Sequence, residues 1–180
     1  NSPTAVYYSD NDGLSWKSAE GLSNAQKWGS AIRGMVSLNY TVYILVNEWD
    51  YSRWKSMVTL YKSVDSGVSF SPVYSTYLNP SFCDIWSPRY FVNTAYFVCK
   101  DTLYEIQNNG KLRLVSINTF IDSYTSGVTL SGSVVENITY ISLLVLTTST
   151  ESIFYFSSDG GRTFRKKGKH KFYPFEKNSF

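Results

Sequence analysis

The residues best suited to ligand chemistry are concentrated in one short segment, residues 48–54. The segment reads Glu-Trp-Asp-Tyr-Ser-Arg-Trp, so it combines two indoles, a phenol, two carboxylates and a guanidinium. Side chains of these aromatic types and arginine contribute most of the binding energy at protein interfaces. The alternative is a long surface loop whose rings pack on the sheet beneath it. We predict a binding site with these contact residues: Trp49, Asp50, Tyr51, Arg53 and Trp54.

A second group of polar residues falls on a stretch that reads as a β-strand. Arg89 lies there with Asp84 and Tyr90, and Arg33 lies on a comparable stretch earlier in the chain. A strand guanidinium can hold an anionic ligand, but it can equally pair with a neighbouring carboxylate. Arg89 is therefore a candidate binding residue with both interpretations open.

Other catalytic and metal-binding arrangements find no support in the sequence. His170 is the sole histidine, so the chain cannot form a Ser-His-Asp triad or a cluster of histidine ligands. No glycine-rich phosphate-binding loop precedes a helix. We expect no catalytic residue of these classes, no metal site and no cofactor.

A short phrase that recurs along the chain predicts the elements that carry these residues. Each copy runs from a Tyr through polar residues to a Gly and then returns to hydrophobic residues. The copies occupy residues 7–16, 61–70, 104–113 and 155–164, of which the third is the least complete. Their glycines lie 54, 43 and 51 residues apart, which is typical of the four-stranded blades of a β-propeller.

The residue types in the phrase fit a hairpin turn. Glycine tolerates a positive φ, and short polar side chains before it can hydrogen-bond to the turn backbone. We expect the aromatic residue after the turn to hold the hairpin against its own sheet or the next. The residues concerned are Ser9, Asn11, Gly13 and Trp16; Ser63, Asp65, Gly67 and Phe70; Ser157, Asp159, Gly161 and Phe164, with Gly110 in the incomplete copy.

The phrase resembles the Asp-box, or BNR repeat, of sialidases and sortilin-type receptors. This resemblance covers nearly the whole chain, and it implies an Asp-box β-propeller whose boxes are structural residues on the outer rim. The alternative role for the box carboxylates is calcium binding. Each copy offers only one or two carboxylates, whereas calcium takes roughly six to eight oxygen ligands, so a structural role is favoured.

The repeat predicts how the chain is divided. We predict an all-β fold, a β-propeller segment of about three and a half four-stranded antiparallel blades. A partial blade would occupy residues 1–24, and complete blades would occupy about 25–77, 78–121 and 122–175. Segment 48–54 would then join the second and third strands of a blade, a position where propellers bind ligands. A closed propeller has four or more blades, so we expect the others from the same or another chain.

The resemblance leaves three functions open. Sialidases hold the sugar carboxylate with three arginines and use a Tyr nucleophile activated by Glu, with an Asp as acid/base. Their Arg-Ile-Pro signature is absent, and only Arg33 and Arg89 fall on expected innermost strands. We therefore expect non-catalytic binding of a protein, peptide or glycan. The alternatives are a sialidase-like glycoside hydrolase and a structural unit of a larger extracellular assembly.

Two sequons indicate a secreted or lumenal location. Asn39 and Asn137 each begin an Asn-x-Thr acceptor for N-glycosylation. Each follows a repeat glycine by about the same number of residues, where the propeller pattern places a surface turn. We predict that both are glycosylated.

The two cysteines, Cys83 and Cys99, permit one disulfide in an oxidising compartment, and we predict this bond. The alternative is two buried thiols. If a tight turn at Asn93 and Thr94 joined their strands, Cys99 would face Pro88. The predicted bond would then require the chain after Cys83 to bulge.

Charge is unevenly distributed along the chain, whose net charge is +3. Six cations lie within ten residues: Arg162, Arg165, Lys166, Lys167, Lys169 and Lys171. This run either binds an anionic partner or protects an outermost strand from edge-to-edge pairing. The modest total charge argues against nucleic acid. No run of eighteen apolar residues is present, so no transmembrane segment is predicted.

Overall fold

Every regular element that the computed structural model describes is a β-strand. The structure describes residues 5–22, 30–77, 83–88, 94–99, 102–107, 109–117, 127–147 and 151–171. These ranges form three four-stranded antiparallel sheets and one two-stranded hairpin. The all-β prediction is confirmed, and the sheets are consistent with blades. None of the described segments forms a helix that could cross a membrane.

Each sheet is a meander in which strands pair in chain order. The N-terminal hairpin contains β1 (Tyr7–Tyr8) and β2 (Lys17–Ser18). The first sheet contains β3 (Ala31–Leu38), β4 (Thr41–Asp50), β5 (Lys55–Ser63) and β6 (Ser71–Tyr77). The second contains β7 (Cys83–Trp86), β8 (Thr94–Cys99), β9 (Thr102–Gln107) and β10 (Leu112–Ile117). The third contains β11 (Gly127–Val135), β12 (Ile138–Leu146), β13 (Glu151–Ser157) and β14 (Arg165–Lys171).

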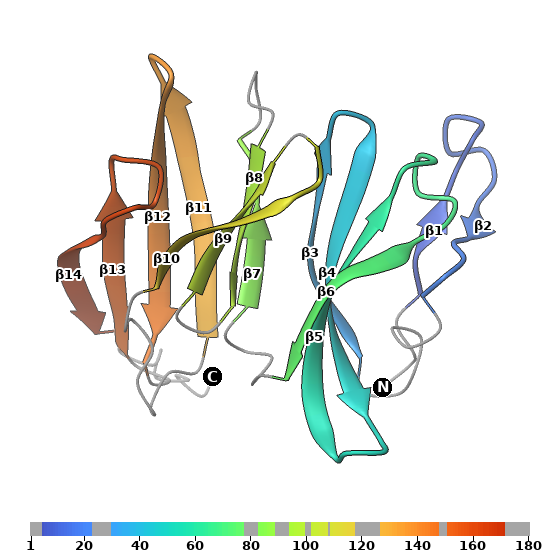
Figure 1. Ribbon diagram of the computed structural model, residues 1–180, viewed down its shortest axis with the longest axis horizontal. Helices are drawn as coiled ribbons and strands as arrows, with labels where there is room; N and C mark the ends of the chain where they lie inside the picture. Colours follow the sequence, from blue (N-terminus) through green and yellow to red (C-terminus); the bar gives the residue numbers. More distant parts are fainter. Residues whose placement is uncertain are drawn as a thin grey trace, which may run out of the picture.

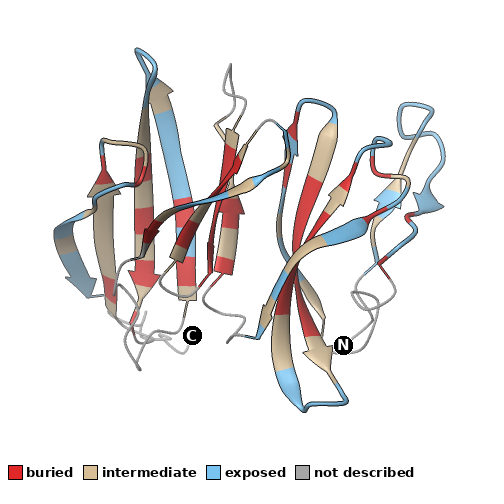
Figure 2. Ribbon diagram, in the orientation of Figure 1, coloured by how far each residue is buried: buried red, intermediate tan, exposed pale blue. Residues whose placement is uncertain are grey.

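The sheets stack face to face in chain order, from the N-terminal hairpin to β11–β14 (Figure 1). Because central strands are covered on both faces, they read as nearly continuous hydrophobic runs. In β4, Tyr43 and Leu45 belong to the cluster shared with the second sheet, whereas Ile44 and Val46 belong to the cluster shared with the N-terminal hairpin. Burial is concentrated in these middle strands, while β14 is exposed (Figure 2).

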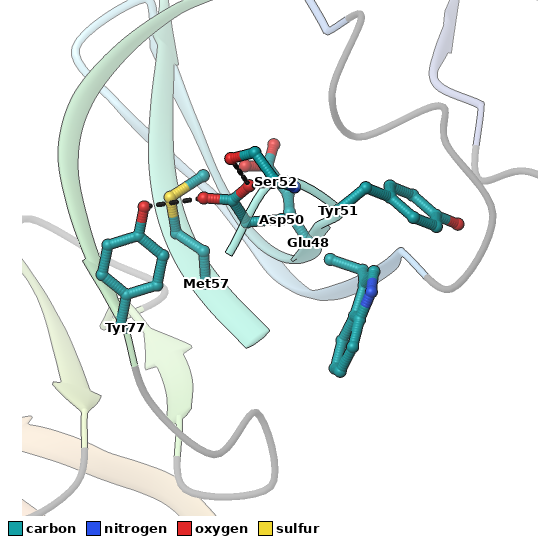
Figure 3. A pocket seen from close by; sticks show the side chains of 7 residues that line it. Glu48, Asp50, Tyr51, Ser52, Met57 and Tyr77 are labelled. Carbon is teal, nitrogen blue, oxygen red and sulfur yellow. Dashed lines mark hydrogen bonds between the residues drawn. The ribbon is translucent and has the colours of Figure 1, made fainter. Parts of the chain in front are cut away.

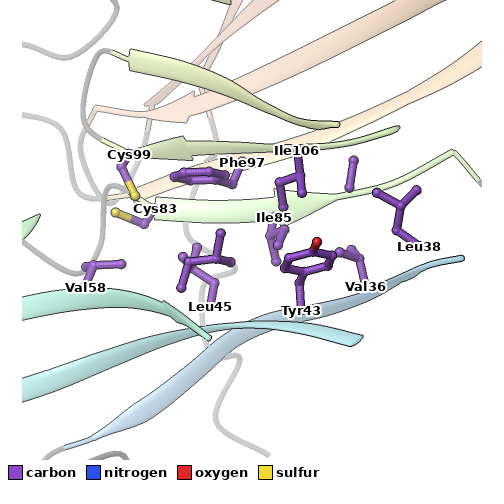
Figure 4. Close-up of a cluster of buried hydrophobic side chains, with 12 residues drawn as sticks. Val36, Leu38, Tyr43, Leu45, Val58, Cys83, Ile85, Phe97, Cys99 and Ile106 are labelled. Carbon is purple, nitrogen blue, oxygen red and sulfur yellow. The ribbon is translucent and has the colours of Figure 1, made fainter. Parts of the chain in front are cut away.

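The largest buried cluster joins the first and second sheets (Figure 4). Tyr43 and Val58 contribute from one side and Ile85 and Phe97 from the other. A further cluster joins the second and third sheets. Val98 contributes from β8, Leu130 from β11 and Ile141 from β12. Hydrophobic burial between sheets therefore holds the stack together.

The first strand of the middle sheet, β7, contacts the first strands of both other sheets, β3 and β11. Gly34 in β3 permits this approach, since a Cβ there would lie 2.6 Å from Cγ2 of Ile85 in β7. The amide of Leu130 in β11 donates to Asp84 Oδ2 of β7 at 2.7 Å. Adjacent first strands with stacked sheets are the arrangement expected of blades around an axis.

The predicted turns lie where the repeat places them. The repeated phrase spans the turns β1–β2, β5–β6, β9–β10 and β13–β14, and its four glycines have φ values between 77° and 91°. Asn39 and Asn137 lie on exposed two-residue turns, β3–β4 and β11–β12. Both residues of each turn have a positive φ, as the favoured two-residue hairpin turn requires. Asn93 lies outside the described residues.

The register predicted for the cysteines was wrong. Cys83 lies directly opposite Cys99, and Trp86 lies opposite Tyr96. β7 ends at Trp86, and Thr94, which was expected to lie in the turn, belongs to β8. Both cysteines are buried with free thiols in the structure, and no bulge is needed to bring them together.

The aromatic residues after the repeated turns behave differently from one another. Phe70 is buried in the cluster against the N-terminal hairpin, and Phe164 packs against the cluster between the second and third sheets. Trp16 is 62% exposed, so the expectation that it holds its hairpin against a sheet is not met. Its sheet has only two strands, and the indole lies beside Gly13 of its own turn.

Candidate functional site

The segment singled out by composition forms the end of an extended β-hairpin. Strands β4 and β5 pair without interruption from Val42 opposite Ser63 to Asp50 opposite Lys55. The expected loop is therefore a four-residue turn, 51–54, and residues 48–50 are strand. Trp49 and its neighbours form cross-strand pairs, which favour continued pairing over a loop.

Asp50 fixes the turn at the end of this hairpin. Its Oδ1 accepts hydrogen bonds from Ser52 N at 2.9 Å, Ser52 Oγ at 2.6 Å and Arg53 N at 3.3 Å. Its Oδ2 accepts from the hydroxyl of Tyr77 at 2.8 Å. The hydrogen bonds from Ser52 and Tyr77 lower the pKa of Asp50 to about 2. Asp50 is therefore ionised and held in one orientation.

A cavity of about 420 Å³ opens beside the turn (Figure 3). Its walls come from both strands of the hairpin and from the last residue of β6, Tyr77. The guanidinium carbon of Arg53 lies 5.2 Å from the centre of the Tyr77 ring, and Arg53 also donates to the Tyr77 hydroxyl. The lining residues are Glu48, Trp49, Asp50, Tyr51, Ser52, Met57 and Tyr77.

A buried carboxylate lies at the inner side of this cavity. Glu48 is only 2% exposed, and it accepts hydrogen bonds from Thr59 Oγ1 at 2.9 Å and from the hydroxyl of Tyr61. Ser75 extends the network by donating to Thr59 Oγ1. Within the described part of the chain no cation lies within ion-pair distance of Glu48. Burial is the main cause of the raised pKa of Tyr61, and the hydrogen bond to Glu48 raises this pKa further. The phenol therefore stays protonated.

Two aromatic rings stand exposed at the end of the hairpin. Tyr51 is 48% exposed and Trp54 is 75% exposed. Trp54 has a φ of 52°, which is uncommon for a bulky side chain and costs of order 1–3 kcal/mol. The turn thus presents a large ring to solvent in a strained backbone conformation.

The structure brings together the five hairpin residues that composition singled out. Arg89 and Tyr90 lie outside the described residues. Arg33 and Asp84 line a separate hollow of about 360 Å³ near the first strands. Burial raises the pKa of Asp84, although the amides of Leu130 and Ile85 oppose this by donating to its carboxylate. No cluster of three metal-ligating side chains occurs in the part of the chain that the structure describes.

Outside segment 48–54, sequence reasoning missed three residues of the site: Met57, Tyr61 and Tyr77. Tyr77 lies opposite Met57 across β5–β6, and Met57 lies opposite Glu48 across β4–β5. This register was hidden because the hairpin was read as a loop. Once both strands are extended to Asp50 and Lys55, the pairing alone places Tyr77 beside the turn.

The three complete copies of the repeated phrase share one set of hydrogen bonds. In each, the Gly amide donates to the first Ser hydroxyl at 2.8 Å, as in Gly67 to Ser63. The residue two after the Gly donates its amide to the Asp or Asn Oδ1 at 2.9 Å. The first Ser also donates to that Oδ1, at 2.6–3.0 Å. The predicted bonds between side chains and turn backbone are thus present.

No protein-family model matches the sequence, and no curated protein matches it. What defines the class of protein is therefore the geometry: an all-β chain of stacked four-stranded meanders, consistent with blades, whose first strands are adjacent.

Proposed function

We propose that this chain is part of an Asp-box β-propeller of the secreted or lumenal compartment, and that it binds a protein, peptide or glycan without catalysis. Three features support the propeller family: the shared hydrogen bonds of the three turns, their position between the third and fourth strands, and the stacked sheets. The exposed sequon turns at Asn39 and Asn137 support the compartment.

The cavity at the end of the β4–β5 hairpin is the observation that carries the binding proposal. Asp50 is a fixed, ionised acceptor at its rim, with the Arg53 guanidinium beside it. Tyr51 and Trp54 present apolar surface to a ligand. Their side chains lose little conformational entropy on binding, because each has few rotatable bonds. Ring faces with a fixed charge are typical of binding hot spots.

A matched pair of substitutions tests this site. Trp54→Asn removes the exposed ring at a positive φ, and Tyr40→Asn does the same at the opposite end of β4, where Tyr40 is 94% exposed with a φ of 61°. Asparagine tolerates this backbone conformation, so neither change adds strain. Because Trp54→Asn creates an acceptor for N-glycosylation with Lys55 and Ser56, the wild-type protein and both variants are produced in a host that does not N-glycosylate.

The wild-type protein is screened against immobilised panels of peptides and of glycans, and each ligand found is titrated. We expect Trp54→Asn to weaken binding by at least about tenfold, the equivalent of roughly 1.4 kcal/mol, and Tyr40→Asn to leave it unchanged. Equal loss in both variants, or none in either, would count against the hairpin site. Absence of binding in both panels would favour a purely structural unit.

Sialidase-like hydrolysis is the second candidate. The family's chemistry needs a tyrosine activated by a glutamate, and the buried Tyr61 is hydrogen-bonded to Glu48. The pKa of Tyr61 is raised rather than lowered, and the side chain is 3% exposed, so this pair supports a structural role. Turnover of a fluorogenic sialoside that Arg89→Ala abolishes would overturn the binding proposal.

A further inference from the structure

Strand β14 carries an unusual density of positive charge on an exposed edge. It reads Arg-Lys-Lys-Gly-Lys-His-Lys, and Arg162 precedes it. Every residue of the strand except Gly168 is exposed. Among the described residues β14 pairs only with β13, so it is the outermost strand of the third sheet.

Only part of this charge is neutralised. Glu151 pairs with Lys169 at 2.5 Å and lies 3.9 Å from Lys171. The other four cations have no ion-pair partner in the ranges that the structure covers: Arg162, Arg165, Lys166 and Lys167. Lys167 instead lies over the ring of Phe156, 5.9 Å from its centre.

The cations project from both faces of the edge. Lys166 lies opposite Tyr155, whereas Arg165 lies opposite Phe156, and neighbouring residues of a strand point to opposite faces. The register shifts at Lys167, which is the extra residue of a bulge. At about 3.3 Å per residue, the strand from Arg165 to Lys171 presents charge along roughly 20 Å.

Protection against edge-to-edge pairing does not account for this charge. The outermost strands of the other two sheets face the same problem and have no run of cations. Strand β6 is the outermost strand of the first sheet and has no charged residue, and β10 in the second has only Arg113, which is paired with Glu105. In two of the three sheets, the outermost strand therefore has no run of basic residues.

We infer that the β14 edge binds a sulfated glycan. Flexible cations on both faces of an edge suit a linear polyanion that wraps the strand, and charge attraction accounts for the contact. Single-stranded nucleic acid would require aromatic rings for base stacking, and β14 has none. An acidic protein segment would require apolar anchors beside the charges, and the strand offers none of these.

Heparin serves as the probe for this site. The triple variant Arg165→Glu/Lys166→Glu/Lys167→Glu is compared with Lys17→Glu/Lys55→Glu/Lys111→Glu, which has the same net charge and also alters exposed residues. We expect wild-type protein to be retained on immobilised heparin, and the β14 variant to bind heparin at least about tenfold more weakly. The control variant retains most of the affinity.

Three results would overturn the inference: no retention of the wild-type protein, equal loss in both triple variants, or binding to DNA as tight as to heparin. The last result would assign the edge to nucleic acid or to polyanions in general. If the charge-reversed strand fails to fold, Arg165→Gln/Lys166→Gln/Lys167→Gln makes the same comparison without introduced repulsion, judged by the same tenfold criterion.

Discussion

Asp65 and Asp159 occupy the same position in two copies of the repeated turn, and the first copy has Asn11 there. Hydrogen bonds from Ser63 and Ser69 lower the pKa of Asp65 to about 2. Burial alone would raise the pKa of Asp159, but hydrogen bonds from Thr163 and Ser157 lower it to about 2. In the first copy one hydrogen bond runs in the opposite direction: Asn11 Nδ2 donates to Ser15 Oγ at 2.8 Å, whereas the Ser69 and Thr163 hydroxyls donate to the aspartates. The turn is kept.

This difference predicts how acid acts on the fold. An unfolded aspartate titrates near about 3.9, so a folded pKa of about 2 stabilises the protein above pH 4, and this contribution is lost as the pH falls through 2. We expect Asp65→Asn/Asp159→Asn to fold at pH 7 and to lose part of the pH dependence of stability between about pH 4 and pH 2. Urea denaturation across this range measures it, with Asp12→Asn as the control outside these hydrogen bonds. An unchanged pH profile would contradict the proposed role of the two carboxylates.

The first serine of the turn gives a second prediction at the same scale. Ser63 is 1% exposed, accepts from Gly67 N and donates to Asp65. Ser63→Ala leaves a buried amide without its acceptor, which costs about 1–3 kcal/mol. Ser9→Ala makes the same change on the exposed N-terminal turn, where water can replace the hydroxyl. Chemical denaturation should therefore show a larger loss for Ser63→Ala; equal losses would mean that burial does not set the cost.

At the scale of elements, strands were predictable wherever the pattern of turns fixes both ends. The strand that carries Arg33 ends at Leu38, immediately before the surface turn that the repeat predicts at Asn39. Two predictions failed where the length of a connection was guessed. Trp49 and Asp50 were read as loop because polar and aromatic residues are mixed there, and only cross-strand pairing with Lys55 and Ser56 extends the hairpin. Ser87 and Pro88 were read as part of the strand that carries Asp84, but β7 ends at Trp86.

The β7–β8 pair carries a prediction of its own, the disulfide between Cys83 and Cys99. Directly opposed residues of an antiparallel pair have Cα atoms about 4.5–5.5 Å apart, within the range that a disulfide spans. The bond would contribute roughly 3 kcal/mol in the chain-entropy model. We expect mass spectrometry of the protein produced through a secretory pathway to show a mass lower by two hydrogens than that of the reduced protein. In the reduced protein, the hydrogen bond with Cys83 and burial raise the pKa of the Cys99 thiol, so alkylation should be slow until the protein unfolds. Rapid native labelling of both thiols would refute the bond.

At the scale of the whole molecule, the stack depends on close contact between first strands of successive sheets. Gly34 has no side chain where β3 meets Ile85 of β7, and Ile85 is 7% exposed. Gly34→Ala therefore forces Ile85 to move, which costs about 1–3 kcal/mol, and Ile85→Ala alone costs about 2–5 kcal/mol through the cavity that it leaves. In the double variant the new methyl group fills part of that cavity, so the loss of stability in the double variant should be smaller than the sum of the two single losses.

Gly168→Ala is the control, because its nearest neighbour, His170, lies 3.8 Å from the added Cβ. Urea denaturation of the four variants measures the coupling energy. A strictly additive result would mean that the space at Gly34 and the side chain of Ile85 are not coupled, and would contradict the close contact of β3 with β7 at this point.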